Sequence, residues 1–180
     1  MRHLITSIAL LVTLALPFHA AAQTPDTGMT AAGASFGVLF PDDAFESTLT
    51  IDAFGEYYLG QRVSIRGLVG WANPGVDGRT EDHFRQARLL FNAVYNWELG
   101  AFHPFATAGA GAYFVRLKRE GDPDPPGETR GGINVGGGGE YFIGPRTTVK
   151  GELRLDVVSH PTALPDATGW SVTFGVKQYF

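Results

Sequence analysis

The sequence predicts an all-β protein whose fold is an eight-stranded antiparallel up-and-down transmembrane β-barrel. Three observations predict it. Apolar and polar residues alternate with a period of two along most of the chain, which is the pattern of β-strands. Short connections alternate with long ones, and the charged residues within the strands share one face. A sheet with these properties has one face suited to lipid and one suited to an enclosed polar space.

The first 22 residues have the pattern of a secretory signal peptide. A basic start, Met1–His3, precedes the apolar run Leu4–Leu16, and the small residues Ala20–Ala22 follow. The apolar run is too short for a transmembrane helix, which needs about 20 residues. We therefore expect residues 1–22 to be a cleaved signal peptide, 23–30 an N-terminal segment and 31–180 the barrel.

Composition limits the classes of protein that remain. The 180 residues suffice for one domain, and the absence of cysteine excludes disulfides and thiolate metal sites. Without Arg2 the 14 Lys and Arg become 13 against 18 Asp and Glu, an acidic balance that argues against a nucleic-acid partner. The 24 glycines follow no fixed period, which excludes collagen.

Eight segments carry the alternation. In the fourth of them, Leu89 and Phe91 alternate with Arg88 and Asn92. In the fifth and sixth the pattern is weaker, because glycines 109, 111, 137 and 139 are assigned to the apolar face. The predicted strands are Ala31–Phe40, Thr48–Leu59, Val63–Trp71, Gln86–Glu98, Phe105–Leu117, Ile133–Phe142, Thr148–Val157 and Trp170–Phe180.

The connections predict two different rims. Three are short, at residues 60–62, 100–104 and 143–146. Four are longer and rich in Pro, Gly and Asp, at residues 41–47, 72–85, 118–132 and 158–169. In bacterial outer-membrane barrels the short turns are periplasmic and the long loops extracellular. An even number of strands then places both ends of the barrel on the periplasmic side.

The charges decide which face points inward. A soluble ligand-binding barrel would place the apolar face inside, whereas a membrane barrel places it outside. Six acids balance six bases, which suits an enclosed interior because an unpaired buried ion costs several kcal/mol. We expect the following charges to line the lumen: Asp52, Glu56, Arg66, Arg88, Glu98, Arg116, Glu140, Lys150, Glu152, Arg154, Asp156 and Lys177.

Aromatic residues near the strand ends support the same orientation. Amphipathic rings gather where a barrel crosses the two lipid–water interfaces. The last predicted strand also alternates up to Phe180, so its final aromatic falls in the short-turn girdle. The predicted membrane-interface aromatics are Tyr57, Trp71, Tyr95, Trp97, Phe105, Tyr113, Tyr141, Trp170 and Phe180.

Two kinds of segment resemble a known family. The terminal pattern Trp170-Ser-Val-Thr-Phe-Gly-Val-Lys-Gln-Tyr-Phe180 and the glycine-rich segments Phe105–Tyr113 and Gly136–Phe142 are similar to those of small outer-membrane barrels of the OmpA, OmpX and opacity-protein type. The resemblance covers the mature chain and implies a bacterial outer-membrane location and recognition of the C-terminal aromatic by the barrel-assembly machinery. Gln178 departs from the apolar or aromatic residue usual there. Family members include scaffolds, adhesins, narrow channels and lipid-modifying enzymes, so function stays open.

The sequence predicts no catalytic, cofactor-binding or metal-binding residues. Ser159 and His160 are adjacent, and neighbouring side chains on an extended segment point in opposite directions, which disfavours a nucleophile–base pair. The lipid A deacylases of this fold carry a His-x-Ser arrangement, which the chain lacks. Residues 136–139 are not a phosphate loop, since no Lys-Ser/Thr follows them. His83 and His103 have no metal-ligand spacing.

The leading functional hypothesis is a structural or surface-interaction barrel with a plugged lumen. Six ion pairs with Phe54, Leu90 and Phe114 are expected to fill it, since eight strands leave room only for side chains. The alternatives are a narrow channel for ions or small solutes, gated by rearrangement of a pair such as Glu140–Arg154, and an outer-membrane lipid-modifying enzyme.

The partners that the sequence predicts are those of an exported membrane protein. We expect contact with outer-membrane lipid and lipopolysaccharide, the assembly machinery during biogenesis, and an extracellular partner at the long loops. The loops carry eleven acids against five bases. This negative net charge could bind divalent cations, or it could simply form a hydrated acidic surface. We expect a monomer.

Overall fold

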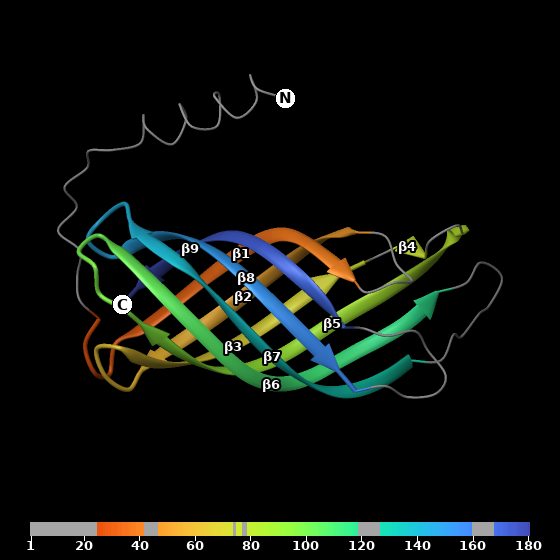
Figure 1. The fold of residues 1–180 in the computed structure, drawn as a ribbon, viewed down its shortest axis with the longest axis horizontal. Coiled ribbons are helices and arrows are strands. Elements are labelled where there is room, and N and C mark those ends of the chain that lie inside the picture. The colour runs from red at the N-terminus through yellow and green to blue at the C-terminus, as the bar shows by residue number, and fades with distance from the viewer. Residues whose placement is uncertain (1–24, 42–46, 74, 77–78, 119–126, 160–167) are drawn as a thin grey trace, which may run out of the picture.

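The computed structural model describes residues 25–41, 47–73, 75–76, 79–118, 127–159 and 168–180. They form an all-β structure (Figure 1). Its strands are β1 (Thr30–Pro41), β2 (Thr48–Tyr58), β3 (Val63–Ala72), β4 (Gly75–Val76), β5 (Arg79–Asn96), β6 (Phe102–Lys118), β7 (Gly127–Phe142), β8 (Thr147–Val158) and β9 (Gly169–Tyr179). None of the described segments is a helix long and apolar enough to cross a membrane.

Eight of these strands close into a barrel. The order in the sheet is β3-β2-β1-β9-β8-β7-β6-β5-β4, and an additional pairing of β3 with β5 completes the ring. All pairings are antiparallel, and β3 meets β5 from Val63 opposite Tyr95 to Ala72 opposite Gln86. The two-residue β4 pairs only with β5, outside the ring. The predicted eight-stranded up-and-down barrel is therefore confirmed.

One rim of the barrel carries the short turns. The turns that join β2 to β3, β5 to β6 and β7 to β8 lie there, as do the start of β1 and the end of β9. The backbone N–H of Phe180 donates to the carbonyl of Thr30 at 2.9 Å, which holds the two ends of the barrel chain together. The opposite rim, at which β1, β3, β6 and β8 end, is called the long-loop rim (Figure 1).

Three strands begin well before their predicted starts. β5 begins at Arg79 instead of Gln86, β6 at Phe102 instead of Phe105, and β7 at Gly127 instead of Ile133. In these extensions the sequence shows no clear alternation of polar and apolar residues. The backbone pairing nevertheless continues, for example between Glu128 on β7 and Val115 on β6.

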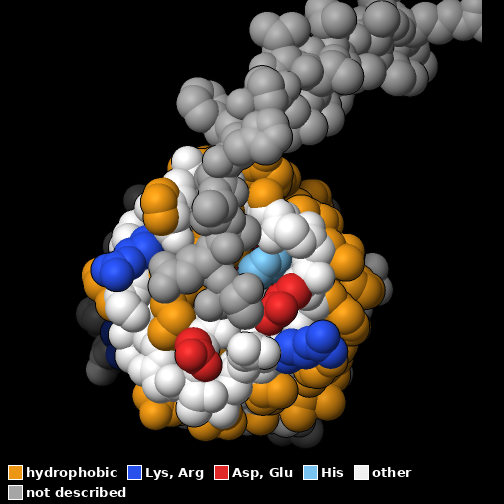
Figure 2. Space-filling model, turned by 90° about the vertical axis from the view of Figure 1, so that its left-hand side faces the viewer, with side chains coloured by type: hydrophobic (Ala, Val, Ile, Leu, Met, Phe, Trp, Pro, Cys, Tyr) orange, Lys and Arg blue, Asp and Glu red, His pale blue; other side chains and the backbone are white. Residues whose placement is uncertain are grey.

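The two faces of the wall differ as a membrane barrel requires. Large apolar side chains such as Phe36, Leu49 and Phe91 are exposed on the outside. Figure 2, which looks onto the short-turn end, shows hydrophobic side chains around the outer wall. The charged side chains at the corresponding inward positions, such as Asp52 and Arg88, are buried. The soluble-barrel alternative, with its apolar face inside, is thereby overturned.

The alternation in β6 has the opposite phase from the prediction. Phe105 and Tyr113 point into the lumen, while Phe114 and Arg116 are exposed outside. The centre of β6 consists of alternating Ala and Gly, so hydrophobicity there does not distinguish the two faces. Gly109 shares the inward parity of Phe105 and Tyr113, and a Cβ there would collide with the backbone and side chain of Asn92 on β5.

Candidate functional site: the charged barrel interior

Ten of the twelve charges that the sequence assigned to the lumen are buried within the barrel. They divide into two charge-balanced groups, one toward each rim. The short-turn cluster contains Glu56, Arg66, Glu140, Lys150, Glu152 and Lys177. The long-loop cluster contains Asp52, Arg88, Arg154 and Asp156.

In the short-turn cluster each base contacts at least one acid. Arg66 donates from Nε to Glu56 at 2.5 Å and pairs through Nη1 with Glu152 at 2.7 Å. Lys150 reaches the same Glu152 at 2.8 Å. Lys177 joins Glu56 at 3.0 Å. Arg66 on β3 and Glu152 on β8 lie on opposite sides of the ring, so their ion pair crosses the lumen. The pair of Arg66 with Glu56 instead joins register partners on neighbouring strands, and that of Lys150 with Glu152 lies within β8.

The long-loop cluster is a second cross-barrel network. Arg88 pairs with Asp52 at 2.6 Å and also donates to the Thr50 hydroxyl at 2.6 Å. Arg154 contacts Asp52 at 3.3 Å and Asp156 at 3.3 Å. Each carboxylate therefore has at least one guanidinium partner, as buried ions require.

The two clusters are joined. Arg154 Nη1 lies 3.7 Å from Glu152 Oε1, so a charged connection runs from the short-turn cluster to the long-loop cluster. Tyr113, also buried, donates its hydroxyl to Asp156 at 2.9 Å. The interior is thus one continuous polar network along the barrel.

Aromatic rings close the lumen at the short-turn rim. Tyr58, Phe142 and Tyr179 are fully or almost fully buried, and the Phe142 and Tyr179 rings stack with centroids 5.5 Å apart. Tyr179 donates its hydroxyl to Glu140 at 3.0 Å, and Lys177 donates to the Tyr58 hydroxyl at 3.0 Å. The rings are therefore fixed to the short-turn cluster.

Apolar side chains fill the space between the charges. Phe54 and Leu90 are buried as the plug prediction requires, and the cluster around them also includes Leu68, Tyr113, Val115 and Val158. Lys150 Nζ lies 4.3 Å from the centroid of the Phe54 ring and 5.2 Å from that of Phe105. These rings therefore stabilise the buried cations by cation–π interaction as well as filling volume.

Four predicted assignments are wrong. Arg116 is exposed on the outer wall. Phe114, predicted to plug the lumen, is 45% exposed on the outside. Phe105 and Tyr113, predicted for the membrane interface, are 3% and 0% exposed within the lumen. All four follow from the phase of β6. Glu98 is half-buried just beyond the end of β5, with the inward parity of Asn96, so its place in the charged interior stays a prediction.

The sequence leaves the pairing of acids with bases open, and the example pair of Glu140 with Arg154 does not form. Glu140 contacts Lys177 at 2.7 Å, whereas Arg154 belongs to the long-loop cluster. Sequence separation carries no information on which residues meet across a lumen, because the inclination of the strands sets their relative heights.

Some buried residues lie outside the predicted charge network. The sequence predicts a long loop at Arg130, but this side chain is buried and pairs with Glu128 at 3.0 Å. Arg130 has the inward parity of Glu140, so a longer β7 would place it in the lumen. Tyr58 and Tyr179 share the parity of the charges beside them. Asn92, which the sequence places on the polar face, donates to Asn134 inside the barrel.

The other predicted interface aromatics lie on the outer wall. Tyr57, Tyr95, Trp97 and Phe180 are exposed toward the short-turn rim, and Tyr141 is half-buried there. Trp71 and Trp170 are exposed toward the long-loop rim. Their contact with the two lipid–water interfaces stays a prediction.

Candidate chemical groups are sparse in the described part of the chain. Ser159 is exposed after β8, while His160 and the side chain of His83 lie outside the described residues. His103 is buried at the short-turn rim, with Nε2 3.1 Å from the carbonyl oxygen of Gly100 and its ring against Phe142. No group of three or more potential metal ligands occurs among the residues that the structure describes.

Comparison with known proteins agrees with this architecture. A family model described as an outer membrane protein beta-barrel domain matches residues 8–177. A comparison with curated proteins gave no match.

Solved structures share the fold at low sequence identity. Neisserial surface protein A superposes with a TM-score of 0.67 at 13% identity, covering 84% of this chain and 96% of that chain. The N-terminal barrel of OprF from Pseudomonas aeruginosa gives 0.63 at 14%, covering 87% and 100%. The attachment invasion locus protein Ail of Yersinia pestis gives 0.56 at 12%, covering 86% and 99%. Because the family model matches almost the whole chain, the protein belongs to the outer-membrane β-barrel domain family and is a small β-barrel of the outer membrane.

Proposed function

We propose that the protein is a surface-interaction barrel, in which a closed wall and a plugged lumen hold the long loops outside the cell. The observation that carries this proposal is the network inside the barrel. It joins both rims through the 3.7 Å contact of Arg154 with Glu152. A rigid, filled barrel is suited to holding loops in place.

The energetics of the network favour a closed lumen. If one charge of a pair left the lumen, its partner would remain buried without a counter-ion, which costs about 3–5 kcal/mol. Glu56 contacts both Arg66 and Lys177, and Asp52 contacts both Arg88 and Arg154. A path for solutes would have to break several such contacts at once and displace Tyr58 and Tyr179 at the short-turn rim.

The charge of the loops indicates the kind of partner. The sequence places eleven acids and five bases in the long connections, and the pair of Arg130 with Glu128 takes one of each, so the excess of six acids is unchanged. Ail of Yersinia pestis has been crystallised with the heparin analogue sucrose octasulfate, a polyanion. The acidic loops here favour a partner with a basic surface instead.

Two measurements test the proposal. Planar-bilayer recordings of the refolded protein should show no stable conductance of porin size. A stable conductance of that size would support the channel alternative and overturn the plug.

The second measurement concerns the loops. Protein in nanodiscs should bind polylysine in low salt and should not bind heparin. A variant with Asp42, Asp43, Asp122 and Asp124 changed to Asn should lose most of that binding. Equal binding of polylysine by this variant, or binding of heparin by the unaltered protein, would contradict an acidic interaction surface.

A further inference from the structure

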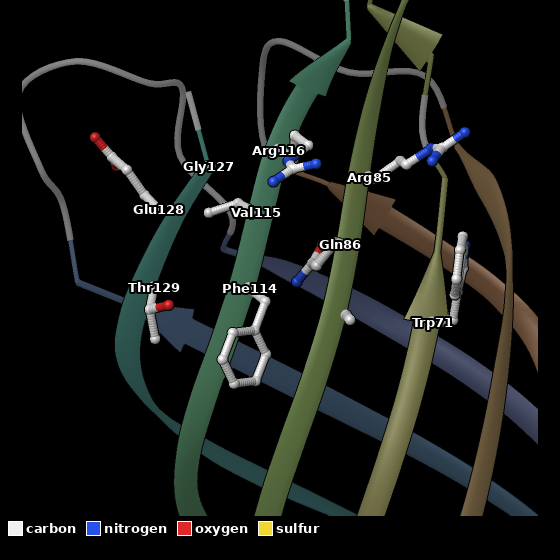
Figure 3. A pocket seen from close by; sticks show the side chains of 10 residues that line it. Trp71, Arg85, Gln86, Phe114, Val115, Arg116, Gly127, Glu128 and Thr129 are labelled. Atoms are coloured by element: carbon white, nitrogen blue, oxygen red, sulfur yellow. The ribbon is translucent and has the colours of Figure 1, made fainter. Parts of the chain in front are cut away.

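Two arginines face each other on the outside of the wall near the long-loop rim. Arg85 on β5 and Arg116 on β6 are direct partners in the antiparallel register. Both side chains are exposed, on the same side of the sheet as Phe114 and Trp71. Figure 3 shows their guanidinium groups at the long-loop ends of neighbouring strands, above the two aromatic rings.

This arrangement favours a counter-charge. Like charges directly opposite each other on neighbouring strands are destabilising. Within the described part of the chain, neither arginine has an acid within ion-pair distance, and the nearby Glu128 is occupied by Arg130 at 3.0 Å. The pair therefore presents two guanidinium groups to the surroundings.

The surface beneath the arginines is a partly open pocket of about 360 Å³. Register places Trp71 opposite Ala87, Ala87 opposite Phe114, and Phe114 opposite Thr129, so these residues form one row across four strands. Arg85 and Arg116 form the next outward-facing row toward the rim. The apolar side chains of Trp71 and Phe114 therefore lie next to the two guanidinium groups, which form the cationic edge of the pocket.

Gly127 gives the guanidinium of Arg116 room to lie against the wall. Gly127 is the partner of Arg116 on β7, and a Cβ added to it would lie 3.3 Å from Arg116 Nε. A larger residue at this position would push the guanidinium away. The backbone of β7 therefore contributes to the shape of the cationic edge.

We propose that Arg85 and Arg116 bind the phosphate of an outer-leaflet lipid headgroup, with an acyl chain of that lipid against Phe114 and Trp71. Guanidinium groups form paired hydrogen bonds with phosphate oxygens, and two of them at one height match a phosphorylated glycolipid. The long-loop rim of an outer-membrane barrel faces the outside, where the lipid is lipopolysaccharide. The proposal needs the outer-membrane location but no loop partner, so it stands apart from the proposed function.

The chain provides a matched control at the other rim. Arg62 and Arg146 are exposed in short turns, at the periplasmic end. Among the described residues neither forms an ion pair, and they are not partners in a strand register. Replacing both with Gln removes the same charge as replacing Arg85 and Arg116.

Tryptophan fluorescence can report on the site directly. Of the three tryptophans, only Trp71 lines the pocket, so Trp97→Phe with Trp170→Phe leaves one probe beside the arginines. This protein, refolded in detergent, is titrated with bis-phosphorylated lipid A and with the same lipid after removal of its phosphates. Inorganic phosphate serves as a competitor.

We expect Arg85→Gln with Arg116→Gln to raise the Kd for bis-phosphorylated lipid A at least tenfold, equivalent to 1.4 kcal/mol. Arg62→Gln with Arg146→Gln should change it less than twofold. Lipid A without phosphates should bind both the unaltered and the Arg85/Arg116 variant equally weakly. Arg85→Lys with Arg116→Lys should give an intermediate Kd, since charge is kept and paired hydrogen bonding is lost.

Three outcomes would overturn the proposal. The first is an equal loss of affinity in the two Gln double variants, which would indicate a general effect of net charge. The second is phosphate-independent binding of lipid A. The third is displacement of lipid A by millimolar inorganic phosphate, which would make free anion the ligand. Heat-dependent gel mobility confirms that each variant is folded before it is titrated.

Discussion

Lys177 on β9 lies 2.7 Å from Glu140 on β7, across the intervening strand β8. The same ammonium group contacts Glu56 on β2 at 3.0 Å, so a single lysine joins three strands through the lumen. Both carboxylates are buried, and Glu140 has only Lys177 as an ion-pair partner within the described residues. Lys177 is therefore the residue whose removal leaves the most charge uncompensated at the short-turn rim.

Lys177→Met should lower the free energy of unfolding by about 3–5 kcal/mol, because Glu140 is left buried without a cation. Adding Glu140→Gln should recover about 2 kcal/mol, since Glu56 keeps its pair with Arg66. Urea unfolding of the protein in lipid vesicles measures both changes. Arg146→Gln, an exposed change of the same charge, should cost less than about 0.5 kcal/mol. A double variant no more stable than Lys177→Met would contradict the pairing.

The close packing of β7 against β8 predicts a position-specific effect of glycine substitution. At Gly138 a Cβ would overlap the carbonyl oxygen of Gly151, whereas at Gly131 a Cβ would meet nothing within 4 Å. Gly138→Ala should therefore destabilise the barrel by about 1–3 kcal/mol, the usual cost of overpacking. Gly131→Ala on the same strand should be close to neutral in the same urea experiment. Equal effects at the two positions would refute the close approach of β8.

The phase of β6 can be read with spin labels. The chain has no cysteine, so Phe105→Cys and Phe114→Cys each create one labelling site. A label at position 114 should be accessible to molecular oxygen dissolved in the bilayer, because Phe114 is on the outer wall. A label at 105 should be shielded within the lumen, and its bulk should reduce the refolding yield. The reverse pattern of oxygen accessibility would restore the assignment predicted from sequence.

The signal-peptide prediction is tested by the N-terminus of protein isolated from outer membranes. Cleavage after Ala22 predicts that sequencing begins at Gln23. Ala22→Pro with Ala20→Pro should block processing and leave a heavier precursor, because small residues are required at these positions. A mature protein that still begins with Met1 would exclude the cleavage.

The sequence predicts this fold well where each strand separates two unlike environments. In β8 the inward residues Lys150, Glu152 and Arg154 alternate with apolar ones, and both faces are assigned correctly. In the centre of β6 alanine lies on one face and glycine on the other, so hydrophobicity does not distinguish them, and the close approach of Asn92 to Gly109 is visible only in the structure. That information is in the register between strands and not in the strand itself.

The ion pairs illustrate the same limit. The alternation of inward and outward residues along β7 shows that Glu140 is inside. Its partner depends on which charged side chains of the other strands lie at the same height along the barrel axis. Lys177 is its partner because β9 brings that lysine to the level of Glu140, two strands away. The outward arginine pair likewise cannot be predicted from the sequence. Arg85 lies before the predicted start of β5, and it becomes the neighbour of Arg116 only because β5 pairs with β6 beyond that point.

The seam between β1 and β9 has a consequence for how the barrel forms. In chain order the ring is closed by its first and last strands, β1 and β9. They pair at eleven positions, from Ala31 opposite Tyr179 to Pro41 opposite Gly169, and so join distant parts of the chain. Until β9 is present, β1 has an unpaired edge that can pair with other chains. The ring therefore cannot close before β9 is present, and pairing between segments so far apart in sequence is intrinsically slow. A truncated chain lacking β9 would not be a smaller barrel but an open, aggregation-prone sheet.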